Sequence, residues 1–176
     1  LCVKHHKLVQ NLRCFQGDYQ LCNNLEYRNH VYQIEKLAKN KREDKIGIGH
    51  TRWATHGAPT ARNAHPHLSE HGRYAVVHNG IIENFSELKE KLLRHGYTFY
   101  SDTDTEVVVK LVDYYYKKYT HDPIEALAKT MVRVRGSYAL AVMFKDHPGK
   151  IFVARKDSPM IIGCDKDASY LAAARK

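Results

Sequence analysis

The sequence lacks any long apolar run. No stretch of its 176 residues approaches the roughly 20 consecutive apolar residues that a membrane-spanning helix needs. The apolar core of a signal peptide is also missing, because the first ten residues include Lys4, His5, His6 and Lys7. We therefore expect a cytoplasmic protein with no membrane partner.

Cysteine is scarce. The four cysteines form no CxxC pair, and three of them fall within the first 22 residues: Cys2, Cys14, Cys22 and Cys164. This spacing is not that of a structural zinc site. In a cytosolic chain we expect reduced thiols rather than a disulfide framework.

Histidine is abundant, with 12 residues, but its pattern does not indicate a metal site. Two pairs stand out, His5-His6 and the residues that flank Pro66, His65 and His67. Neither pair has a third and fourth ligand at the usual spacing. We expect no metal, and no cofactor either.

Acidic residues are outnumbered, with 19 Asp and Glu against 28 Lys and Arg, which gives a formal net charge of +9. A basic balance raises the possibility of a nucleic-acid partner. The basic residues are scattered among acids, as in residues 39–45, and no nucleic-acid motif accompanies them. We expect a solvated basic surface and no nucleic-acid partner. No internal repeat, low-complexity linker or second domain is visible, so residues 1–176 are interpreted as one domain.

The most informative stretch is residues 46–57. A short apolar run over 46–48 predicts the end of a buried strand, and Gly57 with Pro59 predicts a turn beyond it. Between them lies a polar loop that carries Arg52 and the only tryptophan, Trp53. One interpretation is a tight loop whose side chains satisfy its own backbone. The other is a carboxylate site, because the planar guanidinium of arginine matches a carboxylate with two donors.

The remainder of the chain predicts an α+β domain with antiparallel sheets. Helices are expected to begin near residues 84, 103 and 122, the first with Asn84 as its cap and Gly96 at its end, the last ending at Gly136. The second helix has an apolar stripe at Val107, Val108, Leu111 and Tyr115. Asn79-Gly80 predicts a turn. Strands are expected at 74–77, 97–100, 138–144, 151–154, 160–162 and 170–173.

Five motifs carry a family resemblance. They are GIGHTRWATHG at 47–57, NAHPH at 63–67, VHNGIIEN at 77–84, SDTDTE at 101–106 and RGSYA at 135–139. In this order and spacing they resemble the glutaminase domain of the glutamine–fructose-6-phosphate aminotransferases, the sugar-aminating branch of the class II glutamine amidotransferases. The resemblance covers residues 46–172. It implies a four-layer αββα fold of the N-terminal-nucleophile hydrolases.

The resemblance also implies a reaction, the hydrolysis of L-glutamine to glutamate and ammonia through a thioester. Cys2 would be the nucleophile, with its own α-amine as the base. The side-chain amide of Asn79 and the N–H of Gly80 would form the oxyanion hole. The ammonia would serve the amination of fructose 6-phosphate in sugar-isomerase domains that this chain does not contain, and those domains are the expected partner.

Five further residues would hold the glutamine. Arg52 matches the arginine that binds the α-carboxylate, and Asp104 matches the aspartate that binds the α-ammonium. Trp53 matches a tryptophan that closes over the site, and Thr55 and His56 complete the loop. From the residues alone, Asp104 could instead be a helix cap and Trp53 a core aromatic.

The first 45 residues diverge from the family pattern and are shorter. Leu1 precedes Cys2, and Val3 stands where the family has glycine. While the Leu1–Cys2 peptide bond is intact, the α-nitrogen of Cys2 is an amide and not a base. Two hypotheses therefore stay open: an active glutaminase domain, or a truncated or inactive domain of the same fold that binds glutamine without turnover. We expect a monomer or a weak dimer.

Overall fold

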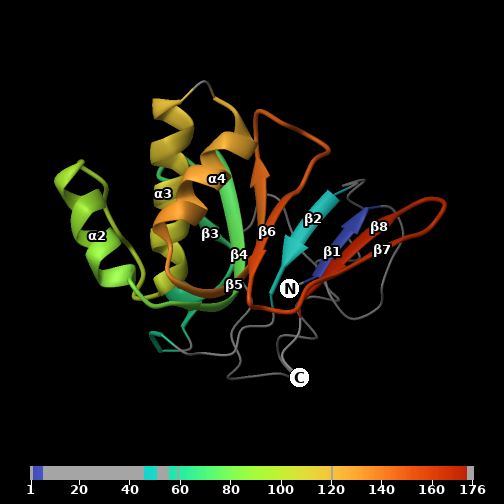
Figure 1. Ribbon diagram of the computed structural model, residues 1–176, viewed down its shortest axis with the longest axis horizontal. Coiled ribbons are helices and arrows are strands. Elements are labelled where there is room, and N and C mark those ends of the chain that lie inside the picture. Colours follow the sequence, from blue (N-terminus) through green and yellow to red (C-terminus); the bar gives the residue numbers. More distant parts are fainter. Residues whose placement is uncertain (1, 6–45, 51–55, 59, 120, 174–176) are drawn as a thin grey trace.

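Figure 1 shows the computed structural model, which describes residues 2–5, 46–50, 56–58, 60–119 and 121–173. Two four-stranded antiparallel sheets form neighbouring layers, and three helices pack on one of them. The predicted α+β organisation with antiparallel sheets is confirmed. None of the helices in these ranges is long and apolar enough to cross a membrane.

The first sheet, sheet A, has the strand order β2-β1-β8-β7. Its strands are β1 (Cys2–His5), β2 (Ile46–Gly49), β7 (Ile161–Cys164) and β8 (Ser169–Ala172). Strand β1 lies between β2 and β8, and Cys2 is opposite both Gly49 and Ala172. Residues 2–5 therefore form an inner strand of sheet A.

The second sheet, sheet B, has the strand order β3-β4-β5-β6. Its strands are β3 (His67–Leu68), β4 (Tyr74–Ile82), β5 (Gly136–Phe144) and β6 (Phe152–Lys156). Strands β4 and β5 pair over their full length of nine residues, from Tyr74 opposite Phe144 to Ile82 opposite Gly136. This long pair is the centre of the domain.

Three α-helices cover the face of sheet B that points away from sheet A (Figure 1). They are α2 (Phe85–Arg94), α3 (Asp104–Lys118) and α4 (Pro123–Arg133), and a short 3₁₀ helix, η1 (Ala61–Asn63), precedes sheet B. Helix α3 packs against β3, β4, α2 and α4, which explains why it is buried almost all round and why its predicted apolar stripe is buried. Within the described ranges, helices cover sheet B alone, so three of the four expected layers are seen.

Two apolar cores separate these layers. The larger one lies between the helices and sheet B and includes Val107, Val108 and Leu140. The smaller one lies between the two sheets and is formed by Ile48, Val77, Ala141 and Leu171. Strands β4 and β5 contribute alternate residues to both cores, as expected for strands buried on both faces.

Both ends of helix α2 lie where the sequence predicts them, but the predicted capping hydrogen bond at its start is not formed. Gly96 has a φ of 83° and follows the cap residue His95, and Tyr97 N donates to Leu92 O, which makes a Schellman motif. At the other end, Asn84 is the cap residue but makes no capping hydrogen bond. Its side chain instead joins Arg133 and Arg135 at the end of α4.

Three sequence predictions were wrong. Asn79-Gly80 is not a turn, because β4 continues through it and pairs with β5. Residues 97–100 form no strand, because the Schellman motif and side-chain acceptors take the N–H groups of Tyr97 and Tyr100. Gly136 does not end α4, which stops at Arg133; it opens β5 instead.

Gly136 is required by a close backbone approach. It has a φ of 114°, and a Cβ atom there would lie 2.2 Å from the carbonyl oxygen of Ile81. We predict that Gly136→Ala lowers the free energy of unfolding by about 3 kcal/mol, measured by denaturant unfolding. Gly163→Ala is the control, since no atom lies within 4 Å of a Cβ at that position. Equal stability of the two variants would contradict the close approach.

Candidate active site

The end of β4 carries the two residues expected to bind the oxyanion. Gly80 has a φ of 141°, and a Cβ atom there would lie 2.1 Å from the carbonyl oxygen of Ser137, so only glycine fits. The side chain of Asn79 crosses to the other sheet, where its Nδ2 donates to Ala173 O at 3.3 Å. Asn79 and Gly80 lie within β4 and do not form a turn. A purely structural role as an Asn-Gly turn therefore does not explain this dipeptide.

The strand register relates the backbone of Cys2 to this same contact. Ala173 directly follows Ala172, the residue of β8 that is opposite Cys2. The hydrogen bond from Asn79 to Ala173 therefore joins sheet B to sheet A next to the backbone of Cys2. Two predicted catalytic residues that are far apart in sequence are thus linked to neighbouring positions at the end of β8, Cys2 to Ala172 and Asn79 to Ala173.

Asp104 is the first residue of α3 and is 4% exposed. It is not the cap residue, which is Thr103. Its Oδ2 accepts a hydrogen bond of 2.8 Å from the backbone N–H of Ile82, two residues beyond Gly80. A carboxylate in the first turn of a helix is also stabilised by the helix dipole. The arrangement fixes a buried carboxyl group beside the end of β4.

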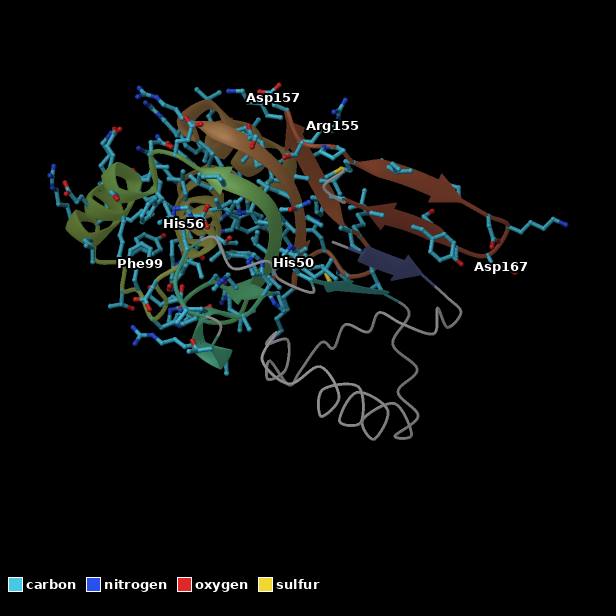
Figure 2. All side chains as sticks on the ribbon, turned by 90° about the horizontal axis from the view of Figure 1, so that it is seen from below. His50, His56, Phe99, Arg155, Asp157 and Asp167 are labelled. Carbon is cyan, nitrogen blue, oxygen red and sulfur yellow. The ribbon has the colours of Figure 1, made fainter. Side chains whose placement is uncertain are left out.

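His56, the first described residue after 51–55, lies near this carboxylate. Its Nδ1 lies 4.0 Å from Oδ2 of Asp104, and its ring packs edge-on against Phe85, with the ring centroids 5.1 Å apart. In the view of Figure 2, His56 lies beside the helices, and His50 lies between them and the hairpin that carries Asp167 at its tip. Arg52, Trp53 and Thr55 lie outside the described residues.

A buried ion pair holds the loop that precedes Asp104. Glu106 is 0% exposed and accepts hydrogen bonds from the N–H of Tyr100 at 3.0 Å, the N–H of Ser101 at 2.7 Å and the hydroxyl of Ser101 at 2.6 Å. Lys110, one turn later in α3 and 2% exposed, places its Nζ 3.9 Å from Glu106. The carboxylate of Glu106 thus fixes both the loop and the start of the helix.

A group of buried histidines lies beneath this loop. The rings of His50 and His65 stack with their centroids 4.4 Å apart, and the ring of His67 meets that of His65 edge-on at 4.9 Å. The two ring nitrogens of His67 contact the hydroxyls of Tyr100, at 3.2 Å, and Thr103, at 2.9 Å. These contacts give the NAHPH motif a structural role. Among the described residues, no group of three or more His, Cys, Asp or Glu could hold a metal ion.

Two tyrosines beside the site remain neutral. Burial raises the pKa of Tyr100 to about 12, and burial also raises the pKa of Tyr138, the residue opposite Gly80. The hydroxyl of Tyr100 accepts a hydrogen bond from Leu68 N at 3.1 Å and contacts His67. It is therefore a stable hydrogen-bonding group at neutral pH rather than a base.

The structure brings four of the predicted site residues to the end of β4 and the start of α3. They are Asn79, Gly80, Asp104 and His56. Glu106 and Lys110 were not predicted as part of the site, although their spacing of four residues is that of a helical ion pair. The side chain of Asn63 was not predicted to contribute either, although it lies inside the NAHPH motif.

The comparisons with known proteins agree with this fold. Among solved structures, a glutamine phosphoribosylpyrophosphate amidotransferase from B. subtilis has a TM-score of 0.63 and 29% identity, covering 81% of this chain and 30% of its own. A glutamine aminotransferase class-II domain protein from Silicibacter pomeroyi has a TM-score of 0.60 and 14% identity, covering 99% of this chain and 90% of its own, and supports the fold alone. The fold is that of the class II, N-terminal-nucleophile amidotransferases.

The family follows from the sequence matches. The sequence model of the glutamine amidotransferase domain matches residues 50–176. The chain therefore belongs to the glutamine amidotransferase domain family, and the predicted resemblance is confirmed.

Two curated relatives carry the name glutamine–fructose-6-phosphate aminotransferase [isomerizing]. One, from Caldanaerobacter subterraneus, is 53% identical over 138 residues, which are 78% of this chain and 22% of the relative. The other, from Pyrococcus horikoshii, is 50% identical over 139 residues, 79% of this chain and 23% of the relative. The chain thus spans less than a quarter of the length of these relatives.

The buried ion pair can be tested by removing one charge. We predict that Glu106→Gln lowers the free energy of unfolding by about 3 kcal/mol, because it leaves Lys110 buried and uncompensated. Adding Lys110→Met should restore much of the loss. Glu87→Gln is the control, since it breaks an exposed pair of the same spacing, with Lys91 Nζ 2.5 Å from Glu87, and should change stability by less than about 1 kcal/mol. A similar loss in both single variants, measured by denaturant unfolding, would refute the assigned role.

Proposed function

We propose that this chain hydrolyses L-glutamine to glutamate and ammonia. In a longer protein, the ammonia would aminate fructose 6-phosphate to glucosamine 6-phosphate in a sugar-isomerase domain. Family membership and the names of the relatives support this assignment. We also propose a cytoplasmic location, one glutaminase domain over residues 1–176, and no nucleic-acid or membrane partner.

The single observation that carries the proposal is the hydrogen bond from Ile82 N–H to Asp104. Through this bond, the buried carboxylate of Asp104 contacts Ile82, which lies two residues after Gly80 in β4. A carboxylate is the natural partner of an α-ammonium group. The ammonium and carboxamide ends of glutamine need such groups within the reach of one substrate. An Asp104 that merely capped α3 would bond the helix backbone, whereas this carboxylate bonds a strand.

The proposed reaction is acyl transfer from nitrogen to sulfur and then to water. The α-amine of Cys2 takes the thiol proton, and the thiolate attacks the carboxamide carbon of glutamine. The negative oxygen that forms would accept hydrogen bonds from the Gly80 N–H and the Asn79 amide. That amide has two N–H donors, of which one donates to Ala173, and we assign the other to the oxyanion.

In the second half, the ammonium of Cys2 returns its proton to the amide nitrogen, the bond between the carbon and that nitrogen breaks, and the nitrogen leaves as ammonia. Water then attacks the thioester, and the C–S bond breaks to release glutamate and the Cys2 thiol. A free α-amine requires that the Leu1–Cys2 peptide bond be cleaved, so we propose that the active chain begins at Cys2.

The remaining residues would hold the substrate. We assign Arg52 to the α-carboxylate, Asp104 to the α-ammonium and Trp53 to closure over the bound glutamine. Thr55 and His56 would complete the loop around it. His56, at 4.0 Å from Asp104, would lie at the ammonium end.

Replacing Asp104 tests this assignment. We predict that Asp104→Asn weakens glutamine binding by at least about 30-fold, because a neutral amide cannot pair with the ammonium group. Isothermal titration calorimetry and an assay of glutamate release would measure binding and turnover separately. Asp113→Asn is the control, because Asp113 is a carboxylate of the same helix, 2% exposed, that bonds Tyr97 and Lys117. It should cost stability without changing glutamine affinity.

The same pair of measurements separates the two hypotheses left open by the sequence. Binding with turnover supports the glutaminase. Binding without turnover supports an inactive glutamine-binding domain. Unchanged affinity in Asp104→Asn would refute the role assigned to that residue.

A further inference from the structure

The side chain of Asn63 joins two segments that are remote in sequence. Asn63 ends η1 and is 1% exposed. Its Oδ1 accepts a hydrogen bond of 2.9 Å from the N–H of Asp102. Its Nδ2 donates to Ala58 O at 3.1 Å and lies 3.4 Å from Oδ2 of Asp102. One buried amide thus holds the segment after His56 to the loop before Asp104.

The contact is also sterically tight. A Cβ atom on Gly57 would lie 2.6 Å from Nδ2 of Asn63 and 3.1 Å from Cβ of Asp102. Gly57, at a φ of 74°, therefore lets the loop backbone lie directly on this side-chain pair. His56 precedes it and lies 4.0 Å from Asp104. A second link runs in parallel, from the guanidinium of Arg62 to the carbonyl oxygen of Tyr100.

We infer that Asn63 is a positioning residue for recognition of the amino-acid head of the substrate, an inference that rests on the proposed function. An α-amino acid carries its carboxylate and its ammonium on the same carbon atom. The groups that bind the carboxylate and the ammonium must be held at one fixed separation. A small displacement of either group weakens binding. Here the ammonium group would be bound by Asp104 at the start of α3, beside the loop that carries His56. Asn63 fixes one segment against the other.

The chemistry of asparagine suits this role. The primary amide supplies both an acceptor for Asp102 N–H and donors for Ala58 O and the Asp102 carboxylate. It carries no charge, so it does not compete with Asp104 for the ammonium group. A charged side chain in the same place would be buried, and burying an unpaired charge costs free energy.

Replacing Asn63 should change the affinity for glutamine and not the rate of its hydrolysis. We expect Asn63→Ala to raise the Kd for glutamine about tenfold, the size of effect that the loss of one buried hydrogen-bonding group produces. The rate of glutamate release at saturating glutamine should change less than about threefold. Iodoacetamide, which has no amino-acid head, should alkylate Cys2 at the wild-type rate. A purely structural defect would alter all three quantities.

A reversed pair provides a rescue. Asn63→Asp alone would place two carboxylates at the 3.4 Å contact with Asp102 and should weaken glutamine binding further. Asp102→Asn in the same chain restores a donor opposite an acceptor. The double variant should therefore bind glutamine more tightly than Asn63→Asp, a coupling that independent sites would not show.

Asn84→Ala is the matched control. The amide of Asn84 also joins remote segments, with Nδ2 donating to Arg133 O and Oδ1 accepting from Arg135 N, both at 2.9 Å, and both of these partners lie outside 56–58 and 102–104. It should lose stability while keeping the glutamine Kd. A wild-type Kd for Asn63→Ala, or an equal rise for Asn84→Ala, would overturn the inference.

Calorimetry also separates this inference from the proposed function. If the wild-type chain binds glutamine but releases no glutamate, the proposed hydrolysis is refuted. The comparison of Kd values still tests the role of Asn63. If the wild-type chain hydrolyses glutamine and Asn63→Ala binds it equally well, only the inference falls. If the wild-type chain binds no glutamine, the proposed function fails and the inference fails with it.

Discussion

The hydrogen bond between the N–H of Ile82 and the carboxylate of Asp104 is the constraint on which the site depends. It joins the last residue of β4 to the first residue of α3, so the sheet and the helix share one fixed point. The neighbouring contacts follow from that junction. Asn79 and Gly80 lie just before it in β4, the loop held by Glu106 lies just before it in the chain, and His56 approaches from the other side.

The region around this junction is unusually polar for a protein interior. Buried carboxylates, hydroxyls and imidazoles surround the start of α3, where an all-apolar core would cost less desolvation. Each group is kept there by specific partners, such as the two backbone N–H groups and the hydroxyl that bond Glu106. Such networks fix geometry more than they add stability. Fixed geometry is what recognition of a small zwitterion requires.

The sequence predicted most of the fold, because its signals are local. The apolar stripe on α3, the proline that opens α4 and the glycine that ends α2 each act through neighbouring residues. The errors arose where a distant partner decides. Asn79-Gly80 continues as strand because β5 pairs with it, and Asn84 bonds the end of α4 instead of capping α2. Asn63 was invisible for the same reason, since its partner Asp102 lies far along the chain.

The most direct test of the account concerns Cys2. The chain would be incubated with an electrophilic analogue of glutamine and analysed by peptide mass spectrometry. The account predicts a single adduct on Cys2, in a peptide that begins at Cys2 and lacks Leu1. A folded chain with no labelled cysteine, or with the label on Cys14 or Cys22, would contradict it.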